Sequence, residues 1–147
     1  MLKGIDPLLS PDLLAILRAM GHGDEIAIVD ANFPAASTAQ RLVRLDGVSA
    51  VAALDAVLSL MPLDEFVEVA AWRMEVVGAP DAEQPVFAAF REVLTRHEGE
   101  RGRLGALERF AFYERARASY AVVATGETQL YGNVILKKGI VRPSETK

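Results

Sequence analysis

The sequence predicts an α/β fold: a single three-layer domain over residues 1–147, with a largely parallel central sheet flanked by helices. Two observations lead to this prediction. Short apolar runs typical of strands alternate with stretches in which apolar residues recur at helical spacing, and that alternation is typical of βαβ units. The chain also contains no internal repeat, low-complexity tract or linker that would divide its 147 residues.

The first helix is expected to begin at the motif Ser10-Pro11-Asp12. Serine caps helices, proline suits the first turn, and aspartate complements the positive end of the helix dipole. Apolar residues then recur at helical spacing until Gly21, which ends the helix. The apolar run at 26–29 is predicted to be a strand buried on both faces, ending at Asp30.

The same criteria predict the remaining elements. They are strands at 43–45, 70–77, 120–124 and 134–136, helices at 49–61, 85–96 and 108–118, and a surface loop at 98–103. In the helix at 108–118, Phe110 and Phe112 cannot face the same side. Part of this aromatic cluster is therefore expected to meet a partner subunit.

Composition limits the classes of function. The net charge of −4 argues against a nucleic-acid partner, and the one tight basic pair, Lys137-Lys138, is expected to be a solvated strand end. No apolar run approaches the ~20 residues that cross a bilayer, and Asp6, Pro7 and Pro11 interrupt any leader peptide. A cysteine-free chain suits the cytoplasm, and a hydrophobic content of 51% favours a homo-oligomer.

Three polar groups stand where strands begin or end, which is where α/β sheets bind ligands. His22 lies between two glycines and could transfer protons near neutral pH, or could be an ordinary exposed histidine. Asp30 could accept a hydrogen bond from a ligand, orient the histidine, or simply cap the following turn. The triplet at 131–133 and Arg109 could bind hydroxyl groups, or could form a turn and a structural ion pair. His97 lies among charged residues and is expected at the surface.

The sequence lacks the motifs that several common enzyme chemistries require. The chain has no phosphate-binding P-loop, no dinucleotide fingerprint, no metal-ligand spacing around its two histidines and no nucleophile elbow. Two classes of function remain: cofactor-free and metal-free chemistry on a polar small molecule, or binding of such a molecule without chemistry.

Seven segments, in the same order along the chain, resemble the fucose mutarotase branch of the ribose pyranase and fucose mutarotase family. They are residues 1–3 (MLK), 8–14 (LLSPDLL), 20–26 (MGHGDEI), 30–34 (DANFP), 109–116 (RFAFYERA), 125–127 (TGE) and 131–139 (YGNVILKKG). Residues 67–103 match least.

The resemblance implies that the protein interconverts the α and β anomers of a free monosaccharide, without cofactor or metal. It implies that His22 is the proton donor, and it implies a decameric ring with sites near the subunit contacts. The substrate-binding residues that it implies are Asp30, Arg109, Tyr131, Gly132 and Asn133. The segments GHGDEI and FAFYERA favour L-fucose over D-ribose.

Two positions depart from the family pattern. Asn32 stands where the family commonly has histidine, and Ala36 replaces a second histidine that some relatives have shortly after the proline. A mechanism that needs two histidines is therefore excluded. The base is then Asp30, a water that it orients, or the Tyr131 hydroxyl. A D-ribose pyranase and a non-catalytic monosaccharide-binding protein are the alternatives.

Overall fold

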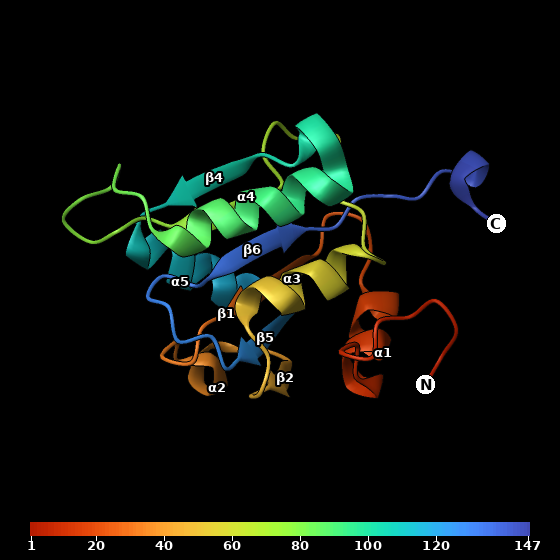
Figure 1. The fold of residues 1–147 in the computed structure, drawn as a ribbon, viewed down its shortest axis with the longest axis horizontal. Helices are drawn as coiled ribbons and strands as arrows, with labels where there is room; N and C mark the ends of the chain where they lie inside the picture. Colours follow the sequence, from red (N-terminus) through yellow and green to blue (C-terminus); the bar gives the residue numbers. More distant parts are fainter.

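The computed structural model describes residues 1–147 and contains one sheet with helices on both of its faces (Figure 1). The strands are β1 (Glu25–Val29), β2 (Leu42–Leu45), β3 (Ala71–Met74), β4 (Leu104–Leu107), β5 (Ala121–Thr125) and β6 (Val134–Lys137). The α-helices are α1 (Pro11–Ala19), α2 (Ala35–Thr38), α3 (Ala50–Leu58), α4 (Pro85–Glu98) and α5 (Arg109–Ala118). Two short 3₁₀ turns follow α4 and β6, at Gly99–Arg101 and Pro143–Glu145.

The six strands lie in the order β2-β5-β1-β6-β3-β4. The pairs β2–β5, β1–β5 and β3–β4 are parallel, whereas β6 runs antiparallel to both of its neighbours, β1 and β3. The prediction of a largely parallel sheet is therefore confirmed, and β6 is the exception. Because β6 runs the other way, its first residues lie beside the carboxyl ends of the other strands.

Two apolar cores lie between the sheet and its helices. Helices α1, α3 and α4 cover one face, where Ile26 and Ile28 of β1 are fully buried. Helices α2 and α5 cover the other face, where Ala27 and Val29 are equally buried. Successive residues of β1 thus point into opposite cores, as predicted for a strand buried on both faces. Figure 1 shows α3 and α4 in front of the sheet and α5 behind it.

Local caps form largely where the sequence predicts them. The Ser10 hydroxyl accepts a hydrogen bond from the Leu13 N–H, 3.2 Å away, at the start of α1. The end of α1 is different from expectation, because the Lys138 Nζ donates to the carbonyls of Leu17 and Met20. Lys138 is therefore a helix cap, and the prediction of a solvated strand end is wrong for it. None of the helices combines the length and the apolar character that crossing a membrane requires.

Two elements escape the sequence-based prediction. The strand β4 follows directly on the predicted loop at 98–103, and its sequence LGAL has neither β-branched residues nor regular alternation. The helix α2 has only four residues, too few for a helical repeat to be recognised. The strand β3 is shorter than its predicted range of 70–77, although Trp72 and Met74 do share one face.

Candidate active site

One edge of the sheet brings together most of the candidate residues. Asp30 follows β1, Arg109 follows β4, and the triplet at 131–133 immediately precedes the antiparallel β6. These positions therefore lie along one edge, in the spatial order β1, β6, β3, β4. The edge meets the rule that ligands bind beyond the carboxyl ends of parallel strands.

Asp30 and Asn133 form a reciprocal pair at the centre of this edge. The Asn133 amide nitrogen donates to Asp30 Oδ2 at 3.1 Å, and the Asp30 backbone N–H donates to Asn133 Oδ1 at 2.8 Å. The other carboxylate oxygen of Asp30 accepts the N–H of Asn32. Burial raises the pKa of Asp30 above its usual value, although these hydrogen bonds partly oppose the effect. A buried carboxylate with a raised pKa is a stronger base than an exposed one.

Tyr131 is the only non-glycine residue of the chain with positive φ, at 62°. Such a conformation is uncommon for an aromatic residue and typically persists where the surrounding structure holds it for function. Its hydroxyl oxygen accepts the N–H of Val77, beyond the end of β3, at 3.0 Å. The ring is thereby fixed across the edge, next to the Asp30–Asn133 pair.

Gly132 permits the close approach of this loop to its neighbours. A Cβ at this position would lie 2.6 Å from Glu127 Cγ and 3.4 Å from Asp30 Cβ. The Glu127 carboxylate in turn accepts N–H groups from Ala50 and Gln129, so it joins the loop to the start of α3. Glu127 is a positioning group that the motif TGE alone did not identify.

Arg109 begins α5 and lines a cavity of about 150 Å³ with Val77, Gly78 and Pro80. Its guanidinium lies 4.6 Å from the centre of the exposed Phe110 ring. No carboxylate pairs with it, so the structural ion pair considered from the sequence is absent. The guanidinium is left free to donate to a ligand.

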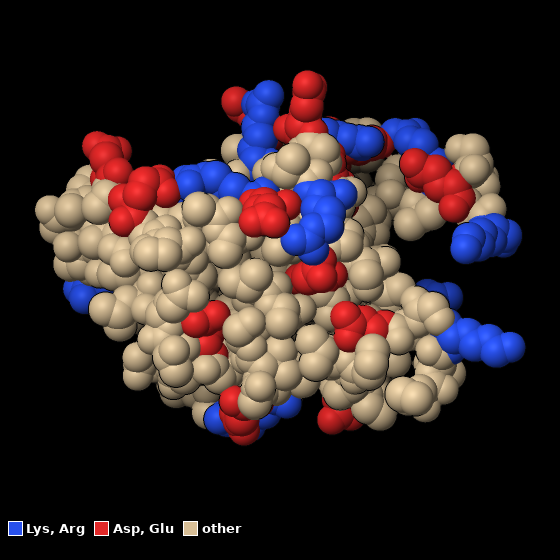
Figure 2. All heavy atoms as spheres, viewed as in Figure 1, with Lys and Arg blue, Asp and Glu red and all other residues tan.

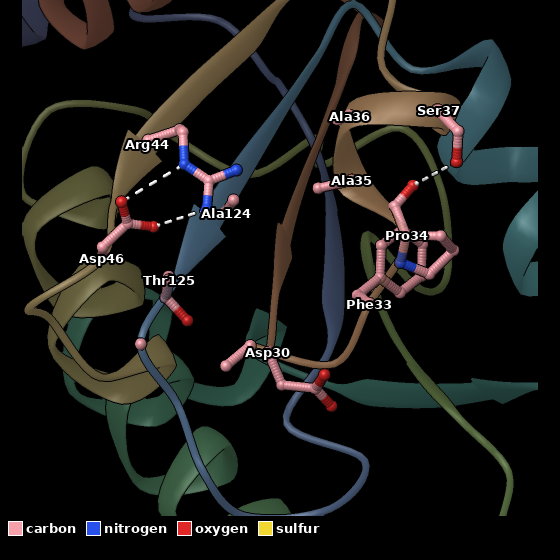
Figure 3. Close-up of a pocket in the computed structure, with 12 residues that line it drawn as sticks. Asp30, Phe33, Pro34, Ala35, Ala36, Ser37, Arg44, Asp46, Ala124 and Thr125 are labelled. Atoms are coloured by element: carbon pink, nitrogen blue, oxygen red, sulfur yellow. Dashed lines mark hydrogen bonds and ion pairs between the residues drawn. The ribbon is translucent and has the colours of Figure 1, made fainter.

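A larger cavity of about 550 Å³ opens beside Asp30, between α2 and the strands β2 and β5 (Figure 3). The α2 segment with Phe33 borders it on one side, and the Arg44–Asp46 ion pair borders it on the other. Its size is ample for a monosaccharide.

His22 lies at the opposite edge of the sheet. The strand β1 has five residues, each rising about 3.3 Å, so the residues that flank it are roughly 15 Å or more apart. His22 precedes β1 and Asp30 follows it, so within one chain Asp30 cannot orient His22. That possibility, raised from the sequence, is corrected by the structure. The side chain of His22 is 46% exposed.

Two residues that the sequence did not single out surround the His22 ring. Its Nε2 lies 3.0 Å from Asp64 Oδ1, and its ring centre lies 5.4 Å from that of Phe66. Both follow Pro62 and are more than 40 positions from His22 in the sequence, so no local motif links them. His22 and these two residues come together because the segments that contain them both form backbone hydrogen bonds with the end of β6. By comparison, His97 is less exposed than expected and contacts Asp55.

Gly139 keeps this arrangement close. An added Cβ there would lie 2.3 Å from the Leu63 carbonyl oxygen and 3.0 Å from the Asp64 Cα, both backbone atoms. We expect Gly139→Ala to lower the free energy of unfolding by about 1–3 kcal/mol, the usual cost of overpacking. Urea denaturation checks this value. Gly47→Ala is the matched control, because no atom lies within 4 Å of its added Cβ; equal losses in the two variants would contradict the prediction.

Comparison with known proteins identifies the family. Residues 3–141 match the model of the RbsD / FucU transport protein family. The chain belongs to the RbsD / FucU family. A fucose mutarotase of Homo sapiens is 50% identical over 95% of this chain and 94% of its own length. An L-fucose mutarotase of Histophilus somni is 44% identical over 95% of this chain and 97% of its own.

Solved members of the RbsD / FucU family have the same fold. The fucose mutarotase of Streptococcus pneumoniae, solved in complex with L-fucose, superposes with a TM-score of 0.90 at 47% identity, covering 96% of this chain and all of that one. Bacillus subtilis RbsD, solved with D-ribose, superposes with a TM-score of 0.73 at 21% identity, covering 97% and 100%. The second likeness extends to the fold alone.

Proposed function

We propose that this protein is an L-fucose mutarotase, an isomerase that exchanges the α and β anomers of the free sugar. The observation that carries the proposal is the buried, hydrogen-bonded Asp30 carboxylate beside Tyr131 and Asn133, at the edge where α/β sheets bind ligands. The names of relatives that are 44–50% identical over nearly the whole chain support the same activity and sugar.

Two copies of the chain are needed to complete the site. His22 and the Asp30 edge are too far apart to contact one small sugar within a single chain. Exposed apolar side chains accompany both halves: Phe66 beside His22 is 64% exposed, and Phe110 and Leu130 near the Asp30 edge are 65% and 64% exposed. Such residues are typical of surfaces that a partner covers. His22 of one subunit would then face Asp30, Arg109 and the triplet at 131–133 of its neighbour.

The broader surface agrees with self-association. Figure 2 shows that uncharged atoms make up most of one face, with a few acidic groups within it and further charged side chains along its upper edge. The assembly proposed is the cytoplasmic homo-oligomer that the family resemblance implies, a decameric ring of single-domain subunits. A chain without cysteine suits that compartment.

The mechanism needs one acid and one base. The Asp30 carboxylate takes the proton of the anomeric hydroxyl. The electron pair of the broken O–H bond then forms the aldehyde C=O. The bond between C1 and the ring oxygen breaks, and the ring oxygen receives a proton from the His22 imidazolium of the neighbouring subunit. Reclosure on the other face of the aldehyde reverses these transfers and restores both groups. Among the candidate bases, the burial and raised pKa of Asp30 favour it over Tyr131, whose hydroxyl already accepts the Val77 N–H.

Arg109, Tyr131 and Asn133 are proposed to hold the sugar hydroxyls, and Gly132 to let the loop approach them. Asn32 and Ala36 do not remove either proposed proton carrier. Asn32 is exposed and supplies its backbone N–H to Asp30, which any residue except proline could do. Their replacement of family histidines is thus compatible with catalysis.

The sugar preference can be tested by saturation-transfer NMR on the anomeric protons. We expect the protein to accelerate α–β exchange of L-fucose more than that of D-galactose, and more than pyranose–furanose exchange of D-ribose. Faster exchange of ribose would favour the pyranase alternative. If the protein binds L-fucose without accelerating its exchange, the result would favour the alternative of a non-catalytic sugar-binding protein.

A further inference from the structure

The His22 ring has one buried partner. Asp64 Oδ1 lies 3.0 Å from its Nε2, and the Asp64 side chain is only 3% exposed although the histidine is 46% exposed. The same oxygen accepts the backbone N–H of Phe66 at 3.1 Å. A buried carboxylate that faces a half-exposed imidazole differs from an ordinary surface ion pair, because its position is set by the protein interior.

The backbone around β6 holds both partners against one short segment. On one side, the N–H of Gly23 donates to the Lys138 carbonyl at 2.9 Å. On the other side, the N–H of Asp64 donates to the Lys137 carbonyl at 3.0 Å, and Leu63 forms a bridge with Lys138. The distance between histidine and carboxylate therefore depends on backbone hydrogen bonds to the end of β6 and not on a flexible contact.

The contact determines which ring nitrogen carries the proton. Burial would raise the pKa of Asp64, but the Phe66 N–H and the His22 ring together lower it below the usual value. Asp64 is then ionised at neutral pH and can only accept hydrogen bonds. The His22 Nε2 must carry a proton, so Nδ1 is the nitrogen that exchanges protons with a ligand. The Phe66 ring, 5.4 Å away, limits rotation of the imidazole.

From this geometry we infer that Asp64 is a positioning residue for His22, which holds the imidazole with Nδ1 turned towards the sugar of the adjoining subunit. The inference rests on the proposed function, in which His22 is the acid. Asp64 does not touch the sugar itself. It acts as the carboxylate of a carboxylate–histidine pair, fixing the tautomer and the orientation of the ring.

Two substitutions of Asp64 distinguish the effect of its contact with His22 from the effect of its hydrogen bond within the local turn. In Asp64→Ser the hydroxyl can still accept the Phe66 N–H, as serine does in such turns, but it is too short to reach His22. In Asp64→Asn the amide oxygen can accept both N–H groups. Glu68→Gln is the matched control, because Glu68 lies in the same segment with its side chain 85% exposed and pairs only with Arg103.

The measurement combines fucose exchange rates with ¹⁵N NMR of the intact oligomer labelled at histidine. The chain has two histidines, so His97, which contacts Asp55, serves as an internal reference. We expect Asp64→Ser to exchange fucose about 10- to 100-fold more slowly, the range for carboxylates that orient metal-bound histidines. Asp64→Asn should restore a rate several-fold above that of Asp64→Ser, and Glu68→Gln should match the unaltered protein.

The ring signals supply a readout that a general loss of stability would not move. At a pH where His22 is neutral, its spectrum should report the Nε2–H tautomer in the unaltered protein and a mixture in Asp64→Ser, with the His97 signals unchanged. Suppose that Asp64→Ser keeps the Nε2–H tautomer and the full exchange rate while His22→Ala is slow. That result would overturn the role of Asp64 but leave the proposed role of His22 intact. A full rate in His22→Ala would overturn the proposed role of His22, and the inference with it.

Discussion

Replacing His22 by alanine is expected to slow L-fucose anomer exchange about 10²–10⁴-fold, the usual contribution of general acid–base catalysis. His22 is the only imidazole near either half of the proposed site, because His97 lies on α4 and contacts Asp55. No other group on its edge could replace it as the acid near neutral pH without a large pKa shift. Saturation-transfer NMR at a fixed enzyme concentration measures the loss.

His97→Ala is the control for this substitution, since it removes an imidazole of similar chemistry from a position outside the site. It should exchange fucose at the unaltered rate. The His22→Ala protein should also keep its oligomeric state in size-exclusion chromatography, because the imidazole is half exposed and its loss leaves no cavity in either core. Unchanged exchange in His22→Ala would remove this residue from the mechanism.

Asp30→Asn is expected to have an effect of comparable size, about 10²–10⁴-fold, because it removes the proposed base with little change in shape. Burial raises the pKa of Asp30 above 3.8, the ordinary pKa of this carboxyl. As the pH is lowered, exchange by the unaltered protein should therefore begin to decline while the pH is still above 3.8. Asp12→Asn is the control, an exposed aspartate on α1 that is remote from the edge. An Asp30→Asn protein that exchanges fucose at the full rate would transfer the role of base to another group.

Mixing the two variants tests whether the site is shared between subunits. If His22 of one subunit acts with Asp30 of its neighbour, unfolding and reassembling an equal mixture of His22→Ala and Asp30→Asn chains creates sites that contain both native residues. Random assembly predicts that about one quarter of the sites are complete, because each position is native with a probability of about one half. Recovered exchange near one quarter of the unaltered rate is the expected result. No recovery above either parent would mean that both residues act within one chain.

Much of the architecture could be predicted from local sequence because it depends on local physics. The Ser10 cap and the fully apolar run of β1 each reflect forces that act over a few residues. The strand β4 could not be recognised, because its LGAL sequence has little intrinsic preference for a strand and is stabilised by pairing with β3. The residues of the Asp30 edge were found from their places at strand ends, together with the family motifs.

The amino-acid sequence alone was sufficient to predict the alternation of strands and helices, the two-sided burial of β1 and the residue types available for acid–base chemistry. The grouping of those residues is set by the tertiary fold. A strand of five residues separates His22 from Asp30, and the antiparallel β6 brings Asp64 to His22 and Asn133 to Asp30. This difference arises because side-chain chemistry and local periodicity depend only on residues that are close together in the sequence. Contacts across 42 or 103 positions depend on which strands pair and in which direction.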